Sequence, residues 1–498
     1  MHRHGPLRGI SACAPGAQAS NGRFGRLFPE LPPLRVDPAA LRSLAGAMVE
    51  SADNGSADNP AIPAAYTYLG QFIDHNITFD TTSLTEAAVD PDSLTNYRRP
   101  RFDLDSVYGA GPVATPHLYQ RDDPDLFEIG AALVFKFEPD SNATVPDFAV
   151  QADLPRARNR FALIGDPRND ENLIVAQLHL AFLFFHNNIV KALRADRPNA
   201  AVFTEARELA ILHYQWLILH EFLPLFAGQA IVDELLAAGT LMRRGGRLFM
   251  PVEFSAAAYR FGHSTLRPLY DLGQAPPATL NDLFTFSGRT GSRADVPIPK
   301  NWIVEWFRLL HMDESALENT LSRRIDPYLA DDLAKLPFPG GVMQSLAELN
   351  LLRGNELGLP SGQSVARFFD YAPLSPAEIG DASPDGQVAT ACGLLEATPL
   401  WYYILKEALV RTGGASLGPV GARIVAEVFI GLLQLDRESI LNRSPAWTPT
   451  LPAREPGTFT FPDLLRFAGV MPQQGPGPGP ALLTPHDYKV SRDSYSPV

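Results

Sequence analysis

The sequence contains very little cysteine. Only Cys13 and Cys392 occur among its 498 residues, and they lie far apart, so the disulfide framework of many secreted proteins is absent. The first twenty residues carry some positive charge but no continuous apolar stretch, and they do not match a secretory signal. We therefore expect a cytoplasmic protein, with export by a leaderless route left open.

Positive charge is also scarce. The 42 lysine and arginine residues are outnumbered by 55 acidic residues, and the resulting net charge of −13 argues against a nucleic-acid partner. No basic patch or RNA-binding motif offsets this balance. The sequence identifies no partner protein.

The apolar segment 208–232 is not a clean hydrophobic run. It is interrupted by His213, Gln215, His220 and Glu221. Polar side chains at this density are costly in a bilayer, so we expect a buried helix here and no membrane span.

Strand-like alternation of polar and apolar residues is scarce, whereas helical periodicity is common. Hydrophobic residues make up 45% and charged residues 19% of the chain, which is normal for a protein with a well-buried core. The fold class that we expect is therefore mainly α, with long loops and little β structure. Helical spacing covers 172–237, 302–322, 340–353 and 399–442, and connections rich in proline and glycine cover 268–300 and 443–458.

The two ends of the chain differ in composition from its middle. Residues 1–30 are typical of an extended N-terminal arm, and residues 472–498, which include QQGPGPGP, are typical of a Pro/Gly-rich C-terminal tail. The length alone would allow two or three domains. We expect one large domain over 31–471, because the motifs below are spread from about 69 to 410 and must converge on one site.

The segment LGQFIDHNITFD at 69–80 is the first of these motifs. It places Asp74 beside His75 among apolar and aromatic residues, where neither would normally be chosen for packing. The pair therefore needs a partner or a task. A lone histidine of this kind is more often a satisfied core residue, so its interpretation depends on the other motifs.

Three further segments follow in order. They are GDPRNDEN at 165–172, which leads into an apolar helical stretch with Arg168 and Glu171 at its start, YRFGHSTLRP at 259–268 and LAELNLLRGNELGLPS at 346–361. Together the four segments resemble the animal-type haem peroxidase family, the myeloperoxidase and cyclooxygenase superfamily. PRFDLDSVYG at 100–109 and WYYILKEALVRTGG at 401–414 resemble its bacterial branch, so the resemblance covers most of the chain.

The resemblance implies a single large helical haem-peroxidase domain that binds haem b. On the distal side, above the iron, His75 would be the catalytic base, with Gln71 as its neighbour and Arg168 as the distal arginine. An imidazole, whose pKa lies near neutrality, can take a proton from the inner oxygen of a peroxide and return it to the outer one. Arg168 would add a fixed positive charge where the O–O bond polarises.

On the proximal side the resemblance implies that His263 is the iron ligand. Asn350 would accept a hydrogen bond from the far nitrogen of His263, which would make the imidazole more basic and better oriented. Arg260 and Arg353 match arginines that lie near the haem propionates in the family.

The implied reaction is the reduction of hydrogen peroxide through a ferryl haem. The ferryl haem would then be discharged by a small-molecule electron donor, either a phenolic or other organic molecule or a halide. The motifs do not reveal which donor is used.

Asp74 and Glu171 match two carboxylates that form esters with haem methyl groups in mammalian members. Two covalent links to haem are therefore expected from the resemblance, whereas a third link through methionine is excluded because residue 172 is Asn. The alternative is that both carboxylates form ion pairs or cap helices.

A calcium site is also implied, since the family's loop offers side-chain and carbonyl oxygens to a hard cation. Asp103 and Asp105 match two of its positions, whereas Asn76 replaces the usual aspartate and Arg99 replaces a threonine. Calcium binding and an ion-free loop held by Arg–Asp pairing both stay open. The candidate residues are Asn76, Arg99, Arg101, Asp103 and Asp105.

Two other functions were weighed. Fatty-acid dioxygenases of the superfamily have a radical-forming tyrosine three residues before the proximal histidine, where this chain has Arg260. Tyr259 lies one residue further back, and helical geometry would turn it about 100° from the expected face. The second alternative is a haem-binding sensor, which needs His263 but has no use for a distal His–Arg pair.

Several histidines are expected to be core or interface residues, and several aromatic residues are expected to serve packing. The histidine pairs spaced by seven residues lie on apolar stretches and lack the close partners of a zinc site. They are His179 with His186 and His213 with His220. The aromatic run Trp401, Tyr402 and Tyr403 is interpreted in the same way.

Overall fold

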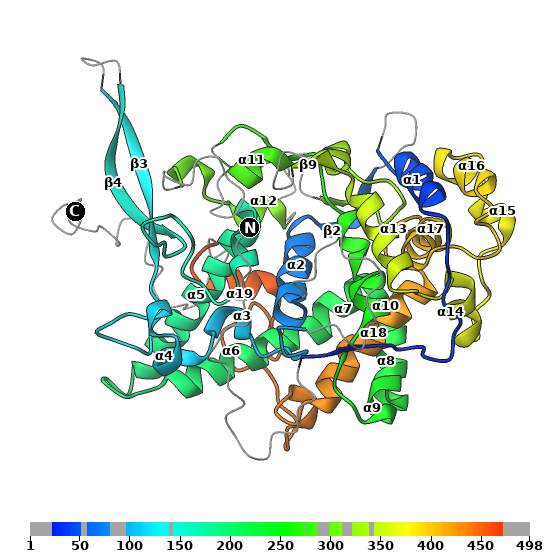
Figure 1. Ribbon diagram of the computed structural model, residues 1–498. Coiled ribbons are helices and arrows are strands. Elements are labelled where there is room, and N and C mark those ends of the chain that lie inside the picture. Colours follow the sequence, from blue (N-terminus) through cyan, green and yellow to red (C-terminus); the bar gives the residue numbers. More distant parts are fainter. Residues whose placement is uncertain are drawn as a thin grey trace.

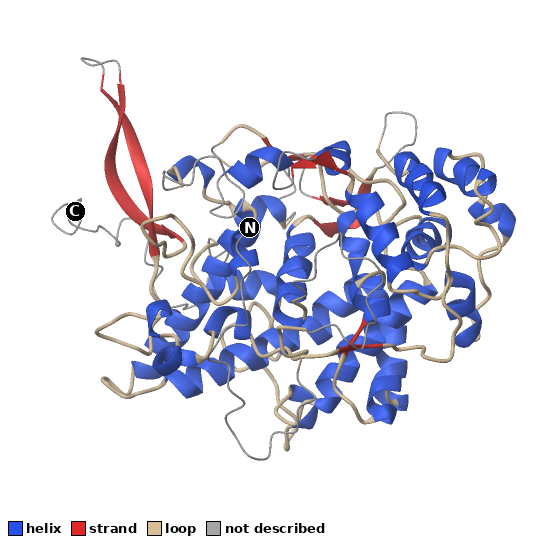
Figure 2. Ribbon diagram, in the orientation of Figure 1, coloured by secondary structure: helices blue, strands red, loops and turns tan. Residues whose placement is uncertain are grey.

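The computed structural model describes residues 22–50, 57–79, 96–138, 143–273, 275–285, 298–310, 321–337 and 343–471. Over these residues the protein is mainly helical, as predicted, and its helices gather in one body from which a long hairpin projects (Figures 1 and 2). The long helices are α2 (Ala65–Ile77), α5 (Leu173–Arg194), α6 (Phe203–Leu217), α17 (Leu400–Thr412) and α18 (Pro419–Leu435).

Helix α18 forms the centre of the body. Its residues are buried along almost the whole length, which is typical of a helix that is apolar on all sides. It contacts α17 and three shorter helices, α7 (Leu223–Ala227), α8 (Gln229–Ala238) and α9 (Leu241–Gly245). Gly431 permits the close approach of α9, because a Cβ there would lie 2.9 Å from Cβ of Met242.

Helices α2 and α5 pack against each other and support the candidate site. Helix α5 is capped by Asn172, whose side chain accepts a hydrogen bond from a backbone N–H of the first turn. Lys191 and Arg194 lie in its last turn, where cations are favourable. The rings of Phe72 and Phe182 stack between the two helices with centroids 4.4 Å apart.

The remaining helices are short. They are α1 (Pro38–Ala47), α3 (Asp105–Tyr108), α4 (Gly111–Ala114), α10 (Val252–Ser255), α11 (Leu280–Thr285), α12 (Trp306–Leu309), α13 (Leu346–Glu356), α14 (Gly362–Phe368), α15 (Pro376–Ile379), α16 (Pro384–Ala391) and α19 (Phe461–Phe467). The 3₁₀ turns are η2 (Pro116–Leu118), η3 (Pro167–Asp170), η5 (Ala258–His263), η6 (Lys300–Trp302), η7 (Asp331–Lys335) and η8 (Ile440–Asn442), and η4 (Ile218–Phe222) is a π-helical turn.

The described strands form two-stranded sheets only, which agrees with the prediction of little β structure. The antiparallel hairpin of β3 (Gly130–Glu138) and β4 (Ala143–Asp153) is much longer than expected and stands away from the helical body (Figure 1). The shorter pairs are β1 (Phe24–Gly25) with β5 (Met250–Pro251), β2 (Asp58–Pro63) with β8 (Leu321–Arg323), β6 (Leu269–Tyr270) with β7 (Ala278–Thr279) and β9 (Leu336–Pro337) with β10 (Met343–Gln344).

The helix predicted over 302–322 is wrong for the residues that the structure describes. Only the single turn α12 forms there, and the stretch ends in β8; residues 311–320 lie outside the described ranges. Strand β8 is held by pairing with β2 and by the ion pair of Arg323 with Asp58, at 3.0 Å. Tertiary contacts therefore override the helical pattern of this segment.

The predicted N-terminal arm is partly built into the domain. Strand β1 pairs in parallel with β5, and Phe24 and Phe28 are buried. The domain therefore begins before the predicted boundary at residue 31. Residues 1–21 and the predicted C-terminal tail 472–498 lie outside the described ranges.

Two stretches among the described residues, Leu173–Arg194 and Phe203–Ala227, are long and apolar enough to cross a bilayer by length and composition. Within the fold, 89% and 61% of their most apolar windows are buried. Core helices of globular proteins pass the same test, so this observation alone does not indicate a membrane span.

Candidate active site

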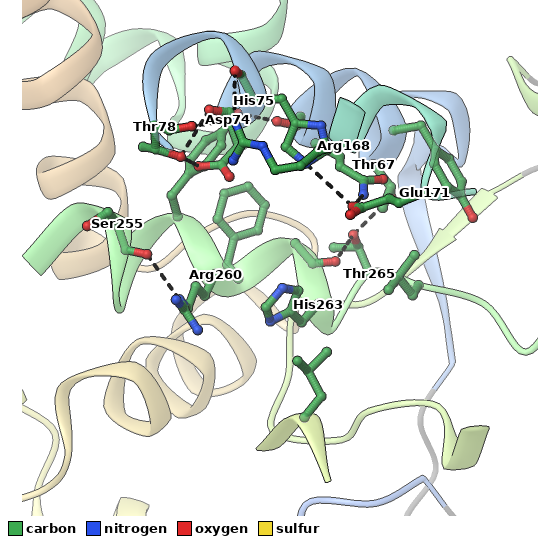
Figure 3. A pocket seen from close by; sticks show the side chains of 18 of the residues that line it. Thr67, Asp74, His75, Thr78, Arg168, Glu171, Ser255, Arg260, His263 and Thr265 are labelled. Carbon is green, nitrogen blue, oxygen red and sulfur yellow. Dashed lines mark hydrogen bonds and ion pairs between the residues drawn. The ribbon is translucent and has the colours of Figure 1, made fainter. Parts of the chain in front are cut away.

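A cavity of about 450 Å³ lies between two groups of elements that are far apart in the sequence. Helix α2 and the turn η3 form one wall, which we call the distal wall. The turn η5 and helix α13 form the other, which we call the proximal wall. Figure 3 shows His75, Arg168 and Glu171 on the first side and Arg260 and His263 on the second.

Helix α2 presents Gln71, Asp74 and His75 to the cavity because residues three and four apart share one helix face. His75 is buried, and its Nε2 lies 3.5 Å from Oε1 of Glu171. The same Oε1 accepts a hydrogen bond from Nε2 of Gln71. Asp74 accepts one from the hydroxyl of Thr78, at 3.0 Å. The predicted distal residues are thus brought together.

Arg168 lies in η3 and not at the start of α5, which begins only at Leu173. Its Nη2 donates to the carbonyl oxygens of His75, at 2.9 Å, and of Thr78, at 2.5 Å. These carbonyls stand at the C-terminal end of α2, where the helix dipole favours a cation. The guanidinium group is therefore fixed to the helix that carries His75.

Asp166 also binds the guanidinium group of Arg168, in addition to the carbonyls of α2. The sequence motifs did not identify this residue. Its Oδ1 accepts from Nε of Arg168 at 3.1 Å, and its Oδ2 accepts from Nη2 of Arg98 at 2.6 Å. Burial alone would raise the pKa of Asp166, but the two arginines outweigh it and hold that pKa below its usual range. The carboxylate therefore stays ionised between two cations.

On the proximal wall, His263 ends η5 and is half-buried at the edge of the cavity. Burial, and then the nearby positive charge of Arg260, lower the pKa of His263 to about 3. The imidazole is therefore neutral, as a metal ligand must be. Arg353, from α13, also lines the cavity and lies 3.9 Å from Glu356.

Asn350 contacts His263 as predicted, but the orientation of its amide differs from the prediction. Its Nδ2 lies 2.8 Å from Nδ1 of His263, while its Oδ1 accepts a hydrogen bond from Nη1 of Arg260 at 2.5 Å. A guanidinium group can only donate, so Arg260 occupies the oxygen that the prediction assigned to His263.

The candidate calcium residues are only partly assembled. Nδ2 of Asn76 donates to Asp105 at 3.2 Å, and Asp103 accepts from the backbone N–H of Asp105 at 3.1 Å. Arg98 lies 3.4 Å from Asp105. Burial and the charge of Asp103 raise the pKa of Asp105 to about 7, while Oδ1 of Asn76 is buried without a hydrogen-bond partner.

Arg99 and Arg101 contribute less than expected to this loop. The carbonyl of Arg99 already accepts from the backbone N–H of Arg101, at 2.7 Å, and the side chain of Arg101 reaches Asp436 at 3.4 Å. Within the described ranges, no three histidine, cysteine or acidic residues are grouped as a metal site would require.

Three of the four histidines that were predicted to be core or interface residues are buried, namely His179, His186 and His213. His220 is exposed and stacks on Trp216 with ring centroids 3.9 Å apart, so it is not a core residue, and an interface position stays a prediction for it. His179 also contacts Asn169, a partner of His75 that the motifs did not reveal.

The aromatic run is buried as expected. Trp401 donates from Nε1 to the carbonyl of Arg260 at 3.2 Å, and Tyr402 donates to Asp385 at 2.7 Å. Tyr259 lies at the cavity wall, but its hydroxyl donates to the backbone carbonyl of Gly70 at 3.1 Å.

The pattern of the family described as animal haem peroxidase matches residues 83–437. Chorion peroxidase of Aedes aegypti is 24% identical over 338 residues, which cover 62% of this chain and 39% of that protein. Thyroid peroxidase of Sus scrofa is 27% identical over 310 residues, which cover 59% and 32%. The chain therefore spans between about a third and two fifths of these curated relatives.

Solved structures share the fold. Peroxidase A of Dictyostelium discoideum superposes with a TM-score of 0.63 at 16% identity, covering 91% of this chain and 94% of that one. Fatty acid alpha-dioxygenase of Oryza sativa superposes with a TM-score of 0.60 at 14% identity, covering 90% and 79%. Because the family pattern matches most of the sequence, from 83 to 437, this chain belongs to the animal haem peroxidase family.

Proposed function

We propose that this protein is a haem peroxidase that reduces hydrogen peroxide and then oxidises a small-molecule donor. One observation carries the proposal: Gln71, His75 and Arg168 line the same cavity as His263, from the opposite wall. The matched relatives, which are named peroxidases, support this activity.

The residues of the cavity fit a haem group. His263 is neutral and can offer a nitrogen lone pair to iron, whereas Arg260 and Arg353 can pair with two carboxylates. Leucine and phenylalanine side chains form much of the remaining lining, as an apolar ring requires. When bound, haem would supply the iron that binds peroxide and the electrons that cleave its O–O bond.

The distal residues would handle the proton and the charge. His75 would accept a proton from the inner peroxide oxygen and return it to the outer one. Arg168 cannot move away easily, since it is held by Asp166 and by two carbonyls of α2, so its charge is preorganised. Gln71 would restrain the carboxylate of Glu171 beside His75.

Iron binding through Nε2 of His263 requires the proton of that ring on Nδ1. Asn350 would then have to present its amide oxygen to His263, and Arg260 would have to give up that oxygen. A propionate is the acceptor that would compensate Arg260. Haem binding and the orientation of the Asn350 amide are therefore coupled in this proposal.

We also infer covalent attachment of the haem through Asp74 and Glu171. Each ester would replace a C–H bond of a haem methyl group with a C–O bond, and hydrogen peroxide would take up the two electrons and the two hydrogens released and leave as water. Both carboxylates line the cavity, as an ester with a ring substituent requires. Mass spectrometry of the denatured holoprotein tests this: haem should stay on the chain, and Asp74→Asn and Glu171→Gln should each remove one link. Haem that extracts completely from the wild type would contradict the inference.

We also propose that this loop binds calcium, which is supported by the partnerless Oδ1 of Asn76 and by the adjacent carboxyls of Asp103 and Asp105. The guanidinium group of Arg98 pairs with the carboxylate of Asp105 and would compete with calcium for it. Metal analysis after dialysis against calcium tests it, with Asp103→Asn as the variant that should lose the ion.

The donor is proposed to be a small organic molecule or a halide, and the net charge of −13 continues to argue against nucleic acid. A dioxygenase is less well supported, because the hydroxyl of Tyr259 is bound to the backbone of α2. A cytoplasmic location stays a prediction.

The decisive assay is oxidation of a phenol by peroxide with the haem-loaded protein. We expect steady turnover in the wild type and a loss of about 10²–10³-fold in Arg168→Leu. Arg197→Ala is the matched control, because Arg197 is a half-exposed arginine that pairs with Glu205. Oxygen uptake with a fatty acid, in place of phenol oxidation, would favour the dioxygenase instead.

A further inference from the structure

A row of three buried side chains leads from the cavity into the protein behind His75. Nδ1 of His75 lies 2.8 Å from Oδ1 of Asn169, and Nδ2 of Asn169 lies 2.9 Å from Nδ1 of His179. Asn169 belongs to η3 and His179 to α5, and both side chains are fully buried. One amide therefore contacts an imidazole with each of its two polar atoms.

This arrangement determines where the protons are. An amide oxygen only accepts, so Nδ1 of His75 carries the proton, and a neutral ring then leaves Nε2 unprotonated. The amide nitrogen only donates, so Nδ1 of His179 is the unprotonated atom of that ring. Burial lowers the pKa of His179 to about 3, which agrees with a neutral imidazole in this position.

His179 is unfavourable as a residue that serves packing alone. Its Nε2 is buried and has no hydrogen-bond partner, and an unsatisfied buried polar group destabilises the folded state. An apolar side chain would fill the space without this cost, so the histidine requires another explanation.

We propose that Asn169 is a positioning residue that holds the proton of His75 on Nδ1 and so keeps Nε2 open as the proton acceptor, while His179 fixes which end of the Asn169 amide faces His75. Without His179, the amide could turn over and present N–H to His75. The proton of His75 would then move to Nε2, where the ring can no longer accept one.

The same amide orientation serves before and after proton transfer. When a proton leaves hydrogen peroxide for Nε2, hydroperoxide remains and His75 becomes a cation with protons on both nitrogens. Oδ1 of Asn169 still accepts from Nδ1, so nothing around the ring has to rearrange. This step rests on the proposed peroxidase function, but the position of the proton on His75 does not.

The tautomer of His75 can be measured directly. In the full chain labelled with ¹⁵N-histidine and loaded with zinc protoporphyrin, a diamagnetic substitute for haem, long-range ¹H–¹⁵N spectra distinguish Nδ1–H from Nε2–H. We expect Nδ1–H in the wild type and in Asn169→Asp, whose carboxylate can only accept. In Asn169→Leu we expect a mixture or Nε2–H. A wild type with Nε2–H, or an Asn169→Leu variant that keeps pure Nδ1–H, would overturn the proposal.

The rate of reaction with peroxide gives the second readout. Loss of a residue that orients a catalytic group typically costs about 10–100-fold, which we expect for Asn169→Leu, with rescue by Asn169→Asp. The matched control is Asn187→Leu: Asn187 is also a buried amide, on α5, that bonds only to the backbone of Phe127. It should lose stability without changing the tautomer or the rate.

His179→Leu keeps the test decisive if Asn169→Leu does not fold. It removes the partnerless Nε2 but also the acceptor of the Asn169 amide, so we expect little net change in stability, yet a mixed tautomer of His75. An inert wild type whose tautomer still depends on Asn169 would refute the peroxidase function and leave the positioning role intact. If the reaction with peroxide is fast but the tautomer of His75 does not change in the Asn169 and His179 variants, the peroxidase function is supported and the positioning role is refuted.

Discussion

The distal and proximal walls of the cavity each contain a histidine, but their surroundings differ. His75 lies beside the carboxylate of Glu171, and the neighbouring arginine is tied to Asp166. His263 is next to the cation of Arg260 and the neutral Asn350. The distal wall places a carboxylate beside its imidazole, whereas the proximal wall places a cation beside its own, which lowers the pKa of His263 and keeps that imidazole neutral. The charges around each ring therefore separate the two roles.

The largest expected effect is the loss of haem from the proximal wall. His263→Ala removes the proposed iron ligand, so the purified protein should retain little haem. His75→Ala is the matched variant on the distal wall and should keep its haem while losing fast reaction with peroxide. Absorbance in the Soret region, measured per protein, checks both; equal haem content in the two variants would contradict the assignment of the walls.

The second-largest effect is expected when the arginine of either wall is replaced by leucine. Arg168→Leu should slow the reaction with peroxide by about 10²–10³-fold, because a preorganised charge is lost from the distal wall. Arg260→Leu, on the proximal wall, should weaken haem retention and leave the rate per bound haem closer to that of the wild type. Stopped-flow kinetics with peroxide measures the rate per bound haem in both variants. If both substitutions slow the reaction to a similar extent, the predicted difference between the two arginines is wrong.

The next effect concerns stability. Asp166→Asn leaves Arg98 and Arg168 without their buried carboxylate, and breaking such a pair costs about 3–5 kcal/mol. Because the two arginines depress the pKa of Asp166, its contribution is present above the unfolded value near 4 and is lost as the pH falls below it.

Urea unfolding of wild type and Asp166→Asn across pH 2–7 measures that contribution. The difference in unfolding free energy should be constant above about pH 5 and shrink toward lower pH. Arg197→Ala, which breaks an exposed pair with Glu205, should change stability by less than about 1 kcal/mol at any pH. A difference for Asp166→Asn that grows on acidification would contradict the sign of the pKa shift.

The smallest effect is expected from tuning the proximal ligand. Asn350→Leu removes the partner of His263 but not the ligand itself, and such changes typically cost about 10–100-fold in affinity or activity. Haem transfer to apomyoglobin would report the rate of haem loss. Unchanged haem loss would mean that Asn350 serves only Arg260.

Much of this arrangement was predictable from short motifs. Gln71, Asp74 and His75 follow from helical spacing, and the contact between Asn350 and His263 was anticipated. Prediction failed where contacts between distant segments decide the structure. Strand β8 pairs with β2 in place of a predicted helix, and Arg260 binds the amide oxygen of Asn350 that was expected to face His263.

The residues behind the distal base could not have been found from the sequence alone. Asp166 and Asn169 lie inside the quoted motif GDPRNDEN, but their roles depend on Arg98 and on His75, which come from other segments. His179 has the spacing of a core residue, and it is one. Its hydrogen bond to Asn169 and its partnerless Nε2 distinguish it from His186, whose two ring nitrogens contact Tyr108 and the backbone of Asp125.

The most direct test of the central claim is the stopped-flow reaction of haem-loaded wild type, His75→Ala and His263→Ala with one equivalent of hydrogen peroxide, with haem content measured in the same samples. We predict a rapid change of the Soret band in the wild type, full haem but a slow change in His75→Ala, and little bound haem in His263→Ala. Haem retained by His263→Ala together with a fast reaction in His75→Ala would contradict the division between the two walls.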